Sequence, residues 1–151
     1  AIRADRFRLV RIAALARIPG AAYAFARMGP PAGADALETQ RDDPGVSMWR
    51  QEAEGFLKEA AAAGDLESMY VLSTNYQMGI YTQQDPVAAL AYAYAYASRQ
   101  EMLDGTKISP GYARLLDVLS RGLSAEQQRT AQERGAAIAA ASPLPQPRQS
   151  H

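Results

Sequence analysis

The chain has no cysteine, and its single histidine, His151, is its last residue. Without cysteine there can be no disulfide, no thiol nucleophile and no thiolate metal ligand. Because the single histidine is the last residue, a serine nucleophile activated by a nearby histidine is not expected, and a cysteine nucleophile is excluded by the lack of cysteine. The absence of cysteine fits both reducing and oxidising compartments, so composition leaves the localisation open.

Long apolar runs and ligand-binding loops are also missing. Arg11, Arg17 and Pro19 interrupt the only segment that approaches the roughly 18 to 20 apolar residues of a membrane span. The glycines stand singly, so no phosphate-binding loop of the Walker or dinucleotide type is present. Asp42 and Asp43 lack the spacing of a calcium loop. We therefore expect no cofactor, no metal and no small-molecule ligand.

Charge is balanced over the whole chain but not along it. Lys plus Arg and Asp plus Glu number 16 each, which gives no overall field for attracting nucleic acid. Before Gly29, however, the basic residues face a single acid, Asp5, and all of them are arginine: Arg3, Arg6, Arg8, Arg11, Arg17 and Arg27. We predict a basic N-terminal arm and no nucleic-acid partner.

The first 46 residues are interpreted as this arm followed by a linker. Apolar residues in 2–18 recur at near-helical spacing and predict a short amphipathic helix ending before Pro19. Residues 29–45 are rich in Pro, Gly and Asp and predict an extended linker. Residues 3–23 also have features of a secretory signal peptide, although Arg17 interrupts the apolar part; a mature chain would already have lost its targeting segment.

The arm has three alternative interpretations. Its helix can pack on the rest of the chain, it can bind a partner, or it can contact a membrane surface or nucleic acid.

From residue 47 to 141 the chain carries repeated signals for helix starts and stops. Ser47, Asp65, Asp85, Ser109 and Ser124 are predicted N-caps, two of them followed directly by proline. The glycines predicted to end helices are Gly64, Gly79 and Gly122, and Asp104-Gly105 is predicted to form a turn. The helix after Asp85 is expected to reach about Gln100, and the last helix, opened by a capping box, to reach about Ala141. Residues 142–151 are expected to form an extended, proline-rich tail.

Alanine and tyrosine alternate from Ala91 to Ala97, a period that on its own is typical of a strand. The preceding Asp-Pro start signal and the length of the segment favour a helix. On a helix Tyr92 and Tyr96 share one face, and Tyr94 projects from the opposite side.

Residues 47–100 resemble the Sel-one-like repeat, a relative of the tetratricopeptide repeat that stacks antiparallel helix pairs. The matching residues are Ala53, Phe56, Ala60, Ala61 and Gly64 for one helix, and Leu72, Tyr76, Gly79, Asp85, Ala89, Tyr92 and Ala97 for the next repeat. Phe56 and Tyr92 stand where the family often has tryptophan. The resemblance implies an all-α fold, a short solenoid-like stack with extended N- and C-terminal arms, and binding to protein partners rather than catalysis.

We therefore expect a non-enzymatic adaptor or structural subunit of a bacterial, envelope-associated assembly, located in the periplasm or cell envelope, with the cytoplasm as the alternative. Its partners would be other protein subunits. The predicted partner-binding residues are Tyr70, Asn75, Tyr81, Tyr94, Arg3, Arg6, Arg8 and Arg11.

Two alternative functions remain open. The first is a peripheral membrane protein that contacts the lipid surface through residues 2–18. The second is an enzyme or enzyme regulator whose acid–base groups come from Glu52, Glu54, Glu59, Asp85, Glu101 or Asp117, although such carboxylates are ordinarily solvated helix faces and caps.

Overall fold

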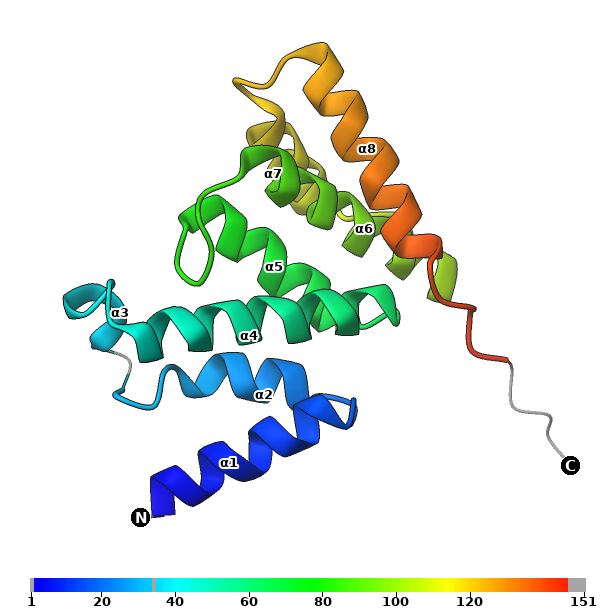
Figure 1. Cartoon of the computed structure of the whole chain (residues 1–151). Coiled ribbons are helices and arrows are strands. Elements are labelled where there is room, and N and C mark those ends of the chain that lie inside the picture. Colours follow the sequence, from blue (N-terminus) through cyan, green and yellow to red (C-terminus); the bar gives the residue numbers. More distant parts are fainter. Residues whose placement is uncertain (1, 34, 147–151) are drawn as a thin grey trace, which may run out of the picture.

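The computed structural model describes residues 2–33 and 35–146, and within these ranges the regular structure is entirely helical. Figure 1 shows α1, α2, α4, α5 and α6 packed in succession, with α7 and α8 packed on α6. In chain order they are α1 (Ile2–Leu15), α2 (Ala21–Met28), α3 (Ala36–Thr39), α4 (Pro44–Ala62), α5 (Leu66–Met78), α6 (Pro86–Asp104), α7 (Pro110–Ser120) and α8 (Ala125–Ala140). The all-α prediction is confirmed.

Most predicted helix boundaries are found in the structure. Gly64 adopts the left-handed conformation with φ of 96°, and Asp65 then caps α5 by accepting a hydrogen bond from the Ser68 amide. Asp85 caps α6 through the Ala88 amide at 3.0 Å. The capping box that opens α8 is present in both directions.

The start of α4 differs from the prediction. Asp43, not Ser47, is its N-cap, because the Asp43 carboxylate accepts a hydrogen bond from the Gly45 amide at 2.8 Å and Pro44 occupies the first helical position. Ser47 therefore lies inside the helix. The predicted boundary at residue 47 falls within α4, and α6 runs four residues beyond Gln100 to Asp104.

The N-terminal arm is also less extended than predicted. No helix is predicted over residues 21–28, yet Phe25 of α2 is fully buried. The Phe25 ring lies 5.2 Å from Phe7 of α1 and 5.1 Å from Phe56 of α4, between ring centroids. Of the three interpretations of the arm, packing on the rest of the chain is therefore the one that the structure shows.

Apart from the short α3, successive helices from α1 to α6 run in alternating directions, and each lies against the next (Figure 1). Contacts join α1 to α2, α2 to α4, α4 to α5 and α5 to α6. Helix α6 also contacts α7 and α8, so it is covered from several sides. The arrangement is compatible with a short stack of antiparallel helix pairs, closed at one end by α7 and α8 and at the other by α1 and α2.

The contact of α6 with α8 depends on very small side chains. Helix α8 places Ala131, Gly135 and Ala139 four residues apart on one face, and all three are buried. A Cβ atom added to Gly135 would lie 2.6 Å from the Ala91 carbonyl oxygen and 2.7 Å from the Tyr94 Cβ. The two backbones are therefore too close for any side chain at this position.

Arg99 fastens the end of α8 to α6. Its side chain is buried, with the residue 3% exposed, and it donates hydrogen bonds to the carbonyl oxygens of Ala139 at 3.1 Å and Ser142 at 2.7 Å. It also donates to the Pro143 carbonyl oxygen at 3.1 Å. The guanidinium thus satisfies carbonyls at the negative end of the α8 dipole and fixes the start of the tail. Residues 143–146 are not helical, as predicted, and His151 lies outside the described residues.

We predict that Gly135→Ala destabilises the protein by roughly 2 to 3 kcal/mol, because the added methyl group must push two backbones apart. Gly55→Ala is the matched control, since Gly55 is also inside a helix but a Cβ there meets nothing within 4 Å. The control should leave the protein unchanged or stabilise it by about 0.5 to 1 kcal/mol. Chemical unfolding measures both values; similar effects of the two variants would contradict the close α6–α8 contact.

Candidate functional site

The predicted tyrosines do not form one surface. Tyr70 is 52% exposed, and its ring centroid lies 5.9 Å from that of Tyr96. Tyr94 projects from the opposite side of α6, toward α8, where its hydroxyl accepts a hydrogen bond from Gln132 at 3.2 Å. Tyr70 on α5 lies beside Tyr96, whereas Tyr94 lies beside Gln132 of α8, so Tyr70 and Tyr94 do not belong to one patch.

Two further predicted contact residues have structural roles. Asn75 is 4% exposed, and its amide donates to the Val71 carbonyl oxygen at 2.8 Å within α5. Tyr81 packs edge-on against Trp49, with ring centroids 5.1 Å apart. A partner cannot reach the buried Asn75, so the prediction that it is a contact residue is wrong. Tyr81 packs at the edge of the core.

A row of tyrosines crosses three helices and was not anticipated as a group. Tyr96 lies between Tyr70 and Tyr112, and its ring centroid is 5.4 Å from that of Tyr112. The Tyr112 hydroxyl donates to the Ala93 carbonyl oxygen at 2.8 Å, and burial raises the pKa of Tyr112. The contact of Tyr112 with Tyr96 depends on how α7 docks on α6, which local sequence signals do not specify.

The four predicted arginines of α1 separate into different roles. Arg11 donates two hydrogen bonds to the Glu52 carboxylate, at 2.7 and 2.9 Å, and so ties α1 to α4. Arg8 lies on the exposed side of α1. Arg3 and Arg6 line a cleft between α1 and α2. The arginine-rich segment therefore supplies one structural clamp and a basic cleft rather than a uniform basic arm.

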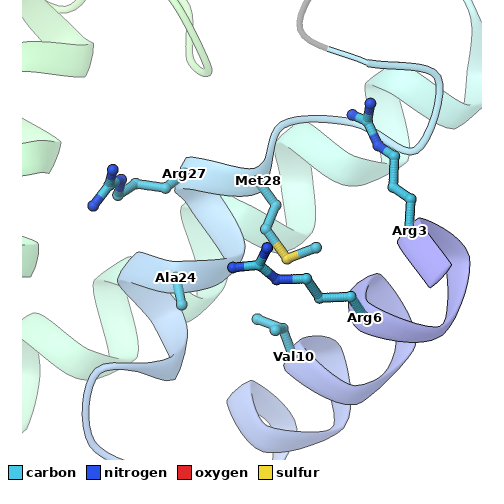
Figure 2. Close-up of a pocket in the computed structure, with 6 residues that line it drawn as sticks. All are labelled: Arg3, Arg6, Val10, Ala24, Arg27 and Met28. Carbon is cyan, nitrogen blue, oxygen red and sulfur yellow. The ribbon is translucent and has the colours of Figure 1, made fainter.

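The cleft between α1 and α2 has a volume of about 670 Å³. Its lining residues follow helical spacing on both sides: Arg3, Arg6 and Val10 on α1, and Ala24, Arg27 and Met28 on α2. Figure 2 shows the Arg6 side chain beside Val10 and Met28, Arg3 extending toward the linker and Arg27 projecting to the other side. We call this surface the arginine cleft. Arg27 and the contribution of α2 were not predicted as site residues.

The arginine cleft combines positive charge with an apolar floor. Val10, Ala24 and Met28 form the floor, and no carboxylate is among the lining residues. The ion pairs among the described side chains are Arg11–Glu52, Arg17–Glu59 and Lys58–Glu54, so none neutralises the three cleft arginines. The Arg27 guanidinium instead lies over the Tyr23 ring, 5.6 Å from its centroid.

The opposite side of α1 exposes large apolar side chains. Leu9, Ile12 and Leu15 are 66%, 51% and 56% exposed. They follow each other at intervals of three residues, so they share one side of the helix, which we call the outer face of α1. Phe7, Val10 and Ala14 form the side of α1 that packs on the core, and Leu15 is turned away from it.

The candidate acid–base carboxylates have structural partners or are exposed. Glu52 pairs with Arg11, Glu59 pairs with Arg17, and Asp85 caps α6. Glu54 accepts a hydrogen bond from the Tyr76 hydroxyl, whereas Glu101 and Asp117 are exposed. Within the described residues there is also no group of three potential ligands that could hold a metal ion.

A second cavity, of about 610 Å³, lies where the turn after α1 meets the end of α4. Ile18, Pro19 and Phe56 contribute apolar walls, and Glu59 and Asp65 contribute carboxylates. Asp65 already caps α5, and Glu59 lies 3.8 Å from the Arg17 guanidinium. Its carboxylates therefore have structural roles.

Comparison of the chain with protein-family models, with curated proteins and with solved structures finds no match. None of the helices in the described part of the chain is long and apolar enough to cross a membrane.

We predict that Arg11→Gln loosens α1 without unfolding the rest of the stack, because it removes the paired hydrogen bonds to Glu52. Hydrogen exchange of α1 amides should become faster, while that of α6 amides stays unchanged. Arg8→Gln, on the exposed side of the same helix, is the control and should not alter α1. Equal effects of the two substitutions would show that the clamp does not hold α1.

The hydrogen bond between Tyr76 and Glu54, 2.6 Å long, predicts a pH dependence of stability. Burial raises the pKa of Glu54, but hydrogen bonds from Tyr76 and Lys58 and the Lys58 charge outweigh it, so the pKa lies below its ordinary value of 4.5. As the pH falls, Glu54 therefore takes up a proton at higher pH in the unfolded chain than in the folded chain. The free energy of unfolding decreases below about pH 4.5 for this reason.

Removal of the Tyr76 hydroxyl should weaken this dependence. Tyr76→Phe is expected to lose about 1 kcal/mol at neutral pH and to lose less stability on acidification than the unchanged protein. Urea unfolding at neutral and acidic pH measures both quantities. Parallel acid profiles for the two proteins would mean that Glu54 is not held in its charged form by Tyr76.

Proposed function

We propose that this chain is a non-enzymatic adaptor or structural subunit that binds other proteins. The observation that carries the proposal is the outer face of α1, where Leu9, Ile12 and Leu15 are each more than half exposed. Neighbouring large apolar side chains are costly to leave in water and are typical of surfaces that another molecule covers.

The position of the outer face in the stack supports this proposal. In the described structure α1 packs on α2 and is tied to α4 by Arg11. Leu9, Ile12 and Leu15 lie on a side of α1 that these contacts leave exposed. An apolar face that no described residue covers favours a contact with another molecule.

The resemblance to Sel-one-like repeats gives the finer part of the proposal. Proteins of that kind hold partners rather than transform them, and bacteria use them widely in the periplasm. We accordingly propose a bacterial assembly in the periplasm or cell envelope as the setting, with the cytoplasm as the alternative. The α4–α5 turn at Gly64 and Asp65 and the Asp85 cap of α6 are the local features that support the resemblance.

Peripheral membrane binding through residues 2–18 is the second candidate function. It is favoured by the same outer face, because Arg8 lies among its apolar side chains and could meet anionic headgroups. Helix α1 would then lie in the membrane interface, with Leu9, Ile12 and Leu15 among the acyl chains.

One variant tests both candidates. The double substitution Leu9→Ser and Ile12→Ser should weaken a partner contact by roughly tenfold to a hundredfold, because it removes two exposed apolar anchors. The control is Met78→Ser with Val118→Ser, which changes similarly exposed side chains on α5 and α7. The variants are purified under mild conditions from the native source, and co-eluting proteins are quantified by mass spectrometry.

The two candidates give different results. A protein that co-elutes in fixed stoichiometry with the unchanged chain and the control, but not with the α1 variant, supports the adaptor. Flotation with phosphatidylglycerol vesicles that the α1 variant alone loses would support membrane binding instead. Retention of the same companions by the α1 variant would contradict the proposed role of the outer face.

A further inference from the structure

The arginine cleft has a chemistry that the outer face of α1 does not share. Arg3, Arg6 and Arg27 line the cleft together with Val10, Ala24 and Met28, and the Arg6 side chain lies beside Val10 and Met28 (Figure 2). All six residues before Gly29 that can carry positive charge are arginines, whose planar groups bind carboxylates through paired hydrogen bonds. The cleft therefore matches a ligand that carries both carboxylates and apolar groups.

We infer that the arginine cleft binds an acidic segment of a partner protein, with apolar side chains on the floor between α1 and α2 and carboxylates on Arg3, Arg6 and Arg27. The inference rests on the proposed adaptor function and names the chemistry of one contact. Charge complementarity is the argument for this occupant, because the described structure places no carboxylate in the cleft lining.

The shape and charge of the cleft argue against other occupants. A bilayer surface is broad and would meet the outer face of α1 rather than enter a cleft between two helices. A nucleic acid would need phosphate contacts along a track, whereas the cleft places apolar groups between its arginines. A second copy that docked symmetrically through the same cleft would bring two basic surfaces together, which like charges disfavour.

The arginines of the cleft are available for such a contact. Arg3, Arg6 and Arg27 are exposed, and none takes part in an ion pair with a described side chain. Arg27 is held over Tyr23, which restricts its side chain on one wall. Substitution of Arg6 or Arg27 by glutamine removes charge at the surface and leaves the buried Phe25 cluster intact.

The test uses the full chain and a fluorescein-labelled peptide of repeating Leu-Glu-Glu. A Leu-Gln-Gln peptide tests the need for carboxylates, and a glutamate-only peptide tests the need for the apolar floor. Fluorescence anisotropy should show binding of the Leu-Glu-Glu peptide alone, weaker at high salt. Arg6→Gln and Arg27→Gln should each weaken binding by about fivefold to tenfold, because each removes a charge-assisted hydrogen bond.

Arg121→Gln is the matched control, since Arg121 is exposed near the end of α7, and it should change binding by less than about twofold. Thermal unfolding followed by circular dichroism checks that all variants fold alike. Equal binding by the unchanged chain and the cleft variants would overturn the inference, as would failure of the Leu-Glu-Glu peptide to bind.

Two further measurements identify other occupants of the arginine cleft. Binding of phosphatidylglycerol vesicles that depends on Arg6 and Arg27, without peptide binding, would assign the cleft to a membrane and overturn the inference. A concentration-dependent dimer that Arg6→Gln dissociates would assign it to a second copy and overturn it as well. If the peptide fails while the Leu9 and Ile12 variant still loses its companion, the adaptor function stands and only the cleft is excluded.

Discussion

The close contact between α6 and α8 is the constraint on which the rest of the fold depends. Helices α5, α7 and α8 all pack on α6. This close packing requires small side chains: the buried positions of α6 are largely alanine, and α8 meets α6 at Gly135. Alanine and glycine let backbones approach closely, but each of them buries little apolar area. Arg99 then completes the contact by binding the carbonyl groups at the end of α8.

The helices that precede α5 in the chain are joined by larger side chains than those at α6. Phe7, Phe25, Trp49 and Phe56 form an aromatic cluster that brings α1 and α2 onto α4. The cluster uses one side of α1 and so turns its outer face to solvent, while the splay between α1 and α2 leaves the arginine cleft. Both surfaces thus follow from packing of the core and lie at the same end of the stack.

Much of the fold could be predicted from local signals, but less of the candidate site. Asp85 with Pro86, Gly64 with Asp65 and the capping box at Ser124 act within a few residues, so the sequence alone predicts the helices they bound. Helix α2 ends at Gly29 before Pro30, but no side chain caps its start, and the burial of Phe25 in tertiary contacts stabilises it. Asn75 and Arg11 were predicted as contacts because burial and pairing across helices cannot be read from spacing.

Helix α6 is the most extensively packed helix of the fold, and the proposed partner contacts lie on α1 and α2. Hydrogen exchange of the free chain and of the chain in its isolated native complex tests this most directly, because each helix is measured in the same experiment. We expect α6 to exchange most slowly in the free chain and the complex to add protection to α1 and α2. Added protection confined to α7 and α8, with α1 and α2 unchanged, would contradict it.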